Sequence, residues 1–226
     1  MFIYLDTETT GSGSDDRLCQ LAYKTEDGHQ VSELFNPGRP ISIDAMCVHH
    51  ITNDMVKDKP KFKGSDTWAK LRELFQSGEN VMVAHNAVFD LHILKAEGIK
   101  PEKVVCTLKL ARHLDTEGTI PRYGLQYLRY YLNLDVSAKA HDALGDTLVV
   151  EAMFKRIHAK VVDQFVDGAV DHMFDFSSKP VLYRRMMFGK YKGIKMEEVP
   201  FDYLQWLTTT DLEADMAYTV RRYLNS

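Results

Sequence analysis

The stretch DTETTG, residues 6–11, constrains this chain most, because it places two carboxylates directly behind a buried-strand pattern. Residues 2–5 are apolar and β-prone, and such a run that stops at a polar cluster is typical of a short buried strand. If the strand continues to Glu8, the side chains of Asp6 and Glu8 share one face, with Cα atoms about 6–7 Å apart. A divalent cation such as Mg²⁺ or Mn²⁺, which prefers oxygen ligands, would turn their mutual repulsion into attraction. Taken alone, the pair is also typical of an exposed strand end.

A second acidic candidate follows another strand pattern. Residues 80–84 predict a short apolar strand, and HNAVFD, residues 85–90, then begins a helix that ends at Gly98. With Asn86 as N-cap, Asp90 falls in the first turn, where the helix dipole favours a carboxylate. The same strand–loop–helix order places Asp90 at the carboxyl end of a sheet strand, where open α/β sheets carry their sites.

The motif HDALGD, residues 141–146, opens a long helix with an apolar stripe. Residues five apart on one helix turn through about 500° and point to different faces. If Asp142 is the N-cap, His141 lies in the preceding loop and Asp146 in the first turn, so both can face one point. Read singly, His141 is an ordinary loop histidine.

The other segments predict a mixed α/β order. Leu18–Thr25 and residues 31–35 form a hairpin around a Glu-Asp-Gly turn. Helices are predicted over residues 65–76, 107–114, 123–132, 203–207 and 211–224, and a short strand at 104–105. The loop SGSDD, residues 12–16, is interpreted as a flexible turn, and His49 and His50 as surface or capping residues with a ligand role as the alternative.

Residues 179–195 contain six cations and no acidic residue, with Tyr183, Phe188 and Tyr191 interleaved. Basic and aromatic side chains together suit nucleic acid, through phosphate neutralisation and base stacking. A glycine-turned hairpin with a charged face explains the composition equally well.

Composition limits the binding partners and the cellular compartment that can be expected for this protein. Lys and Arg number 28 against 32 Asp and Glu, so nucleic-acid binding would need a local patch or bound cations. The three cysteines, Cys19, Cys47 and Cys106, form no C-x-x-C pair, which predicts reduced thiols, a cytoplasmic setting and no zinc site. No stretch approaches the roughly 20 apolar residues of a membrane span, so no membrane partner is expected.

The motifs DTETTG, HNAVFD and HDALGD together resemble those of the DnaQ-like, RNase H-fold 3′–5′ exonucleases that carry four acidic residues and a histidine. The resemblance spans about residues 2–158, and the His-to-Asp spacing of five is that of the histidine subclass. RPISIDAMCVHHIT, FGKYKG and YLQWL resemble an early loop and a small C-terminal region found in one bacterial branch of the family. The resemblance implies an α/β fold with a five-stranded mixed sheet flanked by helices, an exonuclease domain over residues 1–165, and a C-terminal appendage over 166–226 made of a basic hairpin and helices.

The resemblance also implies a reaction. Two Mg²⁺ or Mn²⁺ ions would be held by Asp6, Glu8, Asp90 and Asp146, with His141 as general base, and nucleoside 5′-monophosphates would leave the 3′ end of DNA, single strands being favoured. The substrate would be contacted by Thr9, Thr10, Gly11, His85, Asn86 and Phe89. Candidate DNA contacts in the basic stretch are Arg184, Arg185, Lys190 and Lys192.

One departure from the family concerns Ser12, which stands where many relatives carry a bulky apolar residue after the first glycine. Three alternatives to a DNA repair or processing exonuclease stay open: an RNA exonuclease, a polymerase proofreading subunit, and a non-catalytic nucleic-acid-binding module of the same fold. The sequence predicts no oligomeric state.

Overall fold

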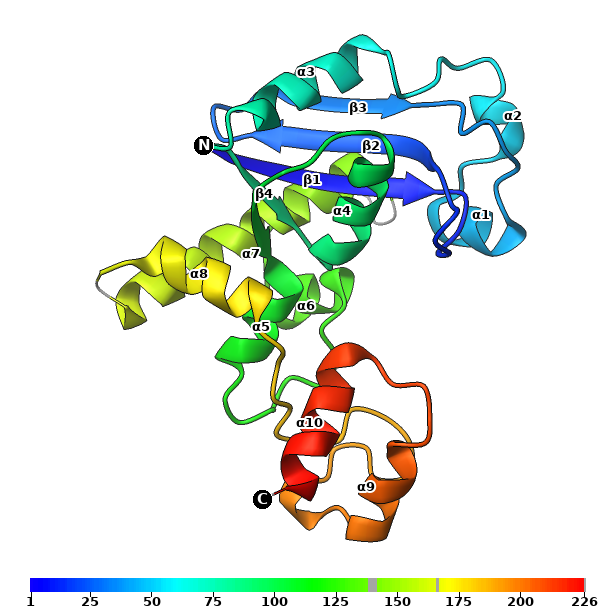
Figure 1. The fold of residues 1–226 in the computed structure, drawn as a ribbon. Coiled ribbons are helices and arrows are strands. Elements are labelled where there is room, and N and C mark those ends of the chain that lie inside the picture. The colour runs from blue at the N-terminus through cyan, green and yellow to red at the C-terminus, as the bar shows by residue number, and fades with distance from the viewer. Residues whose placement is uncertain (138–141, 166, 226) are drawn as a thin grey trace.

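The fold of the 226-residue chain is taken from a computed structural model, which describes residues 1–137, 142–165 and 167–225. Its centre is a five-stranded sheet in the order β3-β2-β1-β4-β5 (Figure 1). The strands are β1 (Phe2–Thr9), β2 (Leu18–Thr25), β3 (Gln30–Leu34), β4 (Val81–Ala84) and β5 (Lys103–Cys106). β1 is antiparallel to β2 and parallel to β4, so the predicted mixed sheet and the predicted hairpin are both confirmed.

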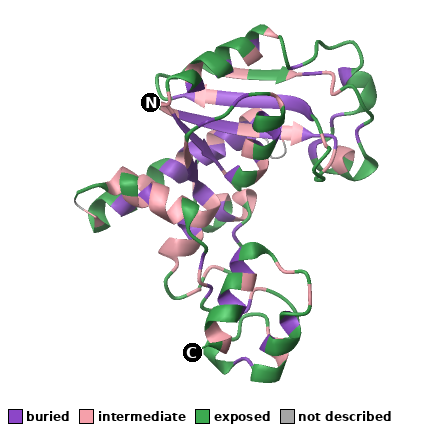
Figure 2. Cartoon of the chain, in the orientation of Figure 1, coloured by how far each residue is buried: buried purple, intermediate pink, exposed green. Residues whose placement is uncertain are grey.

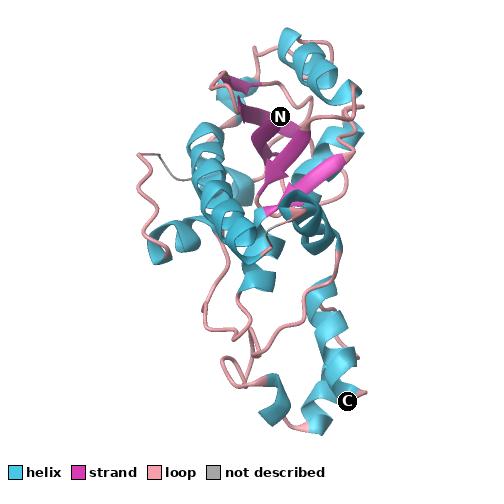
Figure 3. Cartoon of the chain, turned by 90° about the vertical axis from the view of Figure 1, so that its left-hand side faces the viewer, coloured by secondary structure: helices cyan, strands magenta, loops and turns pink. Residues whose placement is uncertain are grey.

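Helices cover both faces of the sheet (Figure 3). They are α1 (Ile43–His49), α2 (Asn53–Val56), α3 (Asp66–Gln76), α4 (Ala87–Ala96), α5 (Thr107–Leu114), α6 (Leu125–Tyr131), α7 (Ala143–Gln164), α8 (Ala169–Ser178), α9 (Phe201–Leu207) and α10 (Ala214–Leu224), with a 3₁₀ turn at Met196–Glu198. Within the described ranges, no helix is both long enough and apolar enough to cross a bilayer.

The alternation of β1 divides the interior into two clusters. Ile3 and Leu5 pack with Leu71 of α3 and Leu94 of α4 on one face, whereas Tyr4 packs with Val150 of α7 on the other. All six side chains are almost fully buried, and Figure 2 shows the central strands in the buried colour. Because side chains at i and i+2 share a face, Asp6 and Glu8 continue the row of Tyr4 and look towards α7.

Side-chain caps fix the beginnings of several helices. Ser65 accepts a hydrogen bond from the Trp68 backbone N–H, and Asp142, the predicted N-cap, accepts one from Gly145. Asn86 behaves differently from the prediction: it precedes α4 with a left-handed φ of 64°, and its side chain makes no capping hydrogen bond. Asparagine tolerates this region better than most residues, so Asn86 begins α4 through its backbone conformation.

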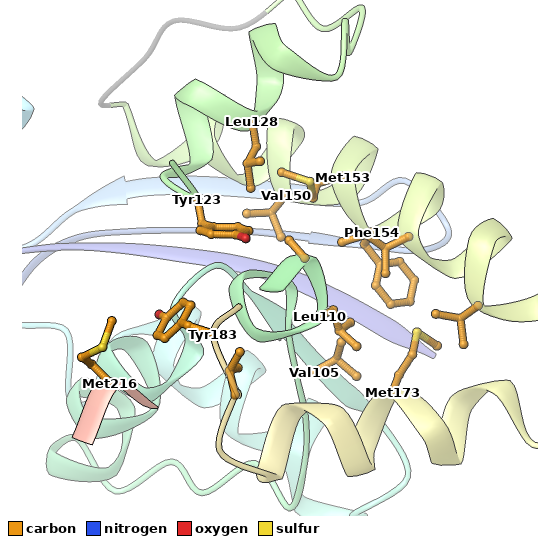
Figure 4. Packing of buried hydrophobic residues seen from close by; sticks show 14 of the residues in the cluster. Val105, Leu110, Tyr123, Leu128, Val150, Met153, Phe154, Met173, Tyr183 and Met216 are labelled. Carbon is orange, nitrogen blue, oxygen red and sulfur yellow. The ribbon is translucent and has the colours of Figure 1, made fainter. Parts of the chain in front are cut away.

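The C-terminal elements join the body through one continuous core. Figure 4 shows Met216 beside Tyr183 in this region and Tyr123 and Leu110 in the body, and all four belong to the same buried cluster. Helix α8 packs on β5, α5 and α7, while the backbone N–H groups of Val181 and Tyr183 donate to side chains of α10. The predicted boundary between residues 165 and 166 stays a prediction. The predicted basic hairpin is an irregular loop with a single β-bridge, between Arg185 and Lys195.

Candidate active site

Three carboxylates meet at the end of β1. Asp6 lies opposite Ala22 and Glu8 opposite Gln20 in the antiparallel register with β2, and Asp146 lies in the first turn of α7. One carboxylate oxygen from each of the three residues lies within 4.8 Å of the others. Residues 140 positions apart in the chain therefore form one acidic cluster.

Local contacts hold the beginning of α7 against the sheet. The side-chain amide of Gln20 donates to Asp142 Oδ1 (3.4 Å), and Gln20 Oε1 accepts from the Ala143 N–H (3.4 Å). Since Gln20 pairs with Glu8 across the strands, the same residue links the strand end to the helix that carries Asp146. This arrangement fixes the distance between β1, which carries Asp6 and Glu8, and α7, which carries Asp146.

Asp90 approaches from the opposite face of β1. Its carboxylate is 3% exposed and accepts a hydrogen bond from Thr7 Oγ1 (2.8 Å), a side chain that points away from Asp6 and Glu8. Asp90 is not one of the three residues whose oxygens lie within 4.8 Å of one another. Its negative charge nevertheless acts on Asp6.

The cluster is electrostatically unfavourable when all its members are ionised. Burial raises the pKa of Glu8 to about 8, with a further increase from the charge of Asp146, and burial raises that of Asp90 to about 7. Burial, followed by the charges of Asp90 and Glu8, raises the pKa of Asp6 well above its ordinary value. Three converging carboxylate oxygens are the donor set that hard divalent cations prefer, and such a cation would offset this repulsion. The residues present therefore fit a divalent metal site.

Gln126 is a site residue that the sequence pattern did not single out. Its side-chain amide donates a hydrogen bond to Asp146 Oδ1, and its own Oε1 accepts one from Arg129 Nη1 (3.2 Å). It lies on α6, where the only sequence signal is an amide beside an apolar stripe. The contact orients the carboxylate of Asp146.

A cavity of about 490 Å³ adjoins the cluster. It is lined by Glu8, Thr9, Thr10, Gly11, Ser12, Gly13, Asp16, Ser42, Asp44, Ala45, Val48, His49 and Phe89. Four of the predicted substrate-binding residues are in this lining, whereas His85 and Asn86 are not.

His49 forms part of the cavity wall, in contrast to its interpretation as a surface or capping residue. Its Nδ1 accepts a hydrogen bond from the Ile51 N–H (3.0 Å), so Nε2 carries the proton and donates to the Thr9 carbonyl (3.1 Å). Burial lowers the pKa of His49, which favours this neutral form. The imidazole thus holds the backbone just beyond Glu8.

The loop after Gly11 is ordered by Asp16 and is not the flexible turn that the sequence suggested. Asp16 Oδ1 accepts from Thr10 Oγ1 (2.5 Å), and Asp16 Oδ2 accepts from the Gly13 N–H (2.7 Å). A Cβ atom on Gly11 would lie 2.6 Å from Asp16 Oδ2, so the approach of this carboxylate requires glycine.

His85 lies behind the site. Its Nε2 contacts the Tyr123 carbonyl (2.8 Å) and its Nδ1 contacts Thr107 Oγ1 (2.9 Å), while burial lowers its pKa to about 4. It therefore stays neutral and links the end of β4 to α5. His141, the predicted general base, lies outside the described residues.

Comparisons with known proteins agree with this geometry. Residues 3–154 match the family described as "Exonuclease", and residues 179–213 match one described as "Putative quorum-sensing-regulated virulence factor". The chain is 30% identical to exodeoxyribonuclease 10 of Escherichia coli K12 over 237 residues, covering 100% of both chains. It is 34% identical to the DNA polymerase III epsilon subunit of Treponema pallidum, over 70% of this chain and 78% of that protein.

Solved structures show the same fold. A structure of exonuclease X in complex with 5′ overhanging duplex DNA matches with a TM-score of 0.58 and 29% identity, over 79% of this chain and 100% of that one. NrnC of Brucella melitensis shares the fold at a TM-score of 0.52 and 20% identity. With a five-stranded mixed sheet, an acidic cluster at the end of β1 and a family match over residues 3–154, the chain belongs to the DnaQ-like exonucleases of the RNase H-like fold.

Proposed function

We propose that this protein is a metal-dependent 3′–5′ exodeoxyribonuclease that releases nucleoside 5′-monophosphates from DNA 3′ ends, favours single strands, and acts in DNA repair or processing in the cytoplasm. The convergence of Asp6, Glu8 and Asp146 beside a cavity lined by the DTETTG loop carries the proposal. The exodeoxyribonuclease name of a relative aligned over the full chain supports DNA as the substrate.

Asp6, Glu8 and Asp146 would hold divalent cations, with Asp90 as a further contributor, and two Mg²⁺ or Mn²⁺ ions would supply charge stabilisation at the scissile phosphate and activation of the attacking water. Thr7 fixes the carboxylate of Asp90 in place, and Gln126 fixes that of Asp146. Preorganised ligands of this kind reduce the reorganisation needed when charge develops.

The remaining residues would bind the strand end and move the proton. Thr9, Thr10 and Gly11 line the cavity and would contact the terminal nucleotide, while Phe89 offers an apolar wall for its base. His141, immediately before the Asp142 cap, would accept the proton of the attacking water, because an imidazole pKa near 6.5 suits neutral pH. In this role His141→Ala lowers kcat far more than it raises KM.

The experiment that tests the proposal compares 5′-labelled and 3′-labelled oligonucleotides in Mg²⁺, as single- and double-stranded DNA and as RNA. We expect mononucleotide release from the 3′ end of DNA, its loss in Asp6→Asn, and retention in the matched surface variant Asp54→Asn, whose carboxylate is exposed on α2. Activity that survives a chelator would overturn the proposed metal dependence. Faster cleavage of RNA than of DNA would show that RNA, and not DNA, is the preferred substrate.

A further inference from the structure

The motif FGKYKG, residues 188–193, plays no part in the proposed active site. Gly189 and Gly193 have φ values of +69° and +84°, and a Cβ on Gly189 would lie 2.6 Å from Tyr203 Oη. Both glycines are therefore needed for the backbone, and Gly189 also for close approach. The loop folds over Tyr203 of α9.

This fold places three aromatic rings in a row. The centroids of Tyr191 and Tyr203 are 4.7 Å apart, and those of Tyr203 and Trp206 are 5.3 Å apart. Trp206 stands at the end of the row and is 54% exposed. Tyrosines 191 and 203 pack partly on the core, so the row is anchored, while the indole faces solvent.

Positive charge borders the row. Lys190 Nζ lies 5.3 Å from the centre of the Tyr191 ring, and Lys190 and Lys192 are both exposed. Arg185, by contrast, donates to the Gly193 carbonyl (3.0 Å) and so stabilises the loop itself. The nearby acid on α9, Asp202, accepts the Tyr203 backbone N–H (2.9 Å) at the beginning of the helix.

We propose that this aromatic–basic surface, formed by Lys190, Tyr191, Lys192, Tyr203 and Trp206, is a second binding site for single-stranded nucleic acid. Trp206 stacks on a base, because every base has a π-face and stacking is tolerant of sequence. The two lysines neutralise phosphates. The inference rests on the proposed function and extends it: the strand whose end enters the cavity is also held by the C-terminal region.

The test uses the full chain carrying Asp6→Asn, so that the strand is not degraded, and a short and a long fluorescent oligothymidylate. Trp206→Ala is expected to weaken binding of the long strand about tenfold and to leave the short one unchanged. Lys190→Ala with Lys192→Ala is expected to reduce the slope of log K against log salt by about 1.4. Lys61→Ala with Lys63→Ala, two exposed lysines before α3, is the matched charge control.

The tryptophans allow a direct readout, because the chain contains two, Trp68 and Trp206. In a Trp68→Phe background, the long oligothymidylate is expected to quench the fluorescence of Trp206. Unquenched emission with unchanged affinity in the lysine variants would overturn the second site, and would point to a protein partner for the surface. If the parent chain with Asp6 intact neither cleaves nor binds any nucleic acid, the proposed function itself fails, which is a separate outcome.

Discussion

Asp6, Glu8 and Asp90 are carboxyl groups that retain protons at a pH where exposed carboxyls have lost them. Above about pH 4, unfolded carboxyls release their protons, whereas Asp90 keeps its proton to about 7 and Glu8 to about 8. The folded state then binds more protons than the unfolded state, so stability falls as pH rises through this window. In the metal-free protein, ionisation of these carboxyls lowers the free energy of unfolding, although metal binding needs them ionised.

The Tm of the chelator-treated protein is expected to fall by several degrees between pH 5 and pH 8, since about 1 kcal/mol corresponds to about 2–4 °C in a chain of this size. Mg²⁺ at pH 8 is expected to restore it, because the cation binds the ionised folded state. Calorimetric scans with and without Mg²⁺ measure both effects, and the variant Asp6→Asn serves as the control with a smaller response. A Tm that rises with pH in the absence of metal contradicts the electrostatic argument.

At the scale of elements, β1 and the loop that follows it form one unit. The strand supplies the carboxylates of Asp6 and Glu8, and Asp16 closes the loop back onto Thr10 and Gly13. We predict that Gly11→Ala displaces Asp16 and lowers kcat/KM by about tenfold to a hundredfold, because small displacements of substrate-positioning groups are costly. Gly13→Ala is the matched control, since its Cβ would lie 3.3 Å from the same oxygen. Steady-state kinetics and hydrogen exchange over the loop measure the outcome, and equal effects of the two variants would contradict it.

Local signals account for the elements that the sequence predicts well. The apolar run before Asp6, the hairpin turn and the Asp142 cap depend on neighbours in sequence, and they appear as expected. The acidic motifs predicted four carboxylates in one site, and the structure brings three of the four close together.

Long-range contacts account for what the sequence did not predict. His49 reaches the Thr9 carbonyl across 40 positions, and Gln126 reaches Asp146 across 20, so neither role leaves a local pattern. The left-handed conformation of Asn86 also escaped prediction, because the residue suits both a side-chain cap and this backbone region.

At the scale of the whole molecule, a buried ionic contact joins the C-terminal region to the body. Asp215 of α10 is 3% exposed, and its carboxylate accepts from Arg112 Nη1 (3.0 Å) on α5 and from the Val181 N–H (3.1 Å). The Nζ atom of Lys109 lies 3.4 Å from Asp215 Oδ1. The guanidinium of Arg112 also lies over the rings of Tyr123 and Tyr183, so the contact is enclosed by both parts of the chain.

We predict that Asp215→Ala destabilises the protein by about 1–3 kcal/mol, because the buried Val181 N–H loses its acceptor, while Arg112 keeps the carboxylate of Glu213 as a partner (2.7 Å). Asp54→Ala, which removes one half of an exposed ion pair with Lys57, is expected to cost under about 1 kcal/mol. Urea denaturation of both variants measures the difference. Equal stability of the two variants would mean that the ionic contact does not hold the C-terminal region in place.

The shared core has a consequence for the length of the strand that the protein can hold. Tyr123, Tyr183 and Met216 belong to a single buried cluster, so the C-terminal region is packed on the exonuclease body and not tethered to it by a linker. The two proposed binding sites for one strand, the cavity at the end of β1 and the aromatic–basic surface around Trp206, would then lie at a fixed distance from each other. The protein would then discriminate strands by length. A strand long enough to span both sites would stay bound after each cleavage, and a strand shortened below that span would dissociate.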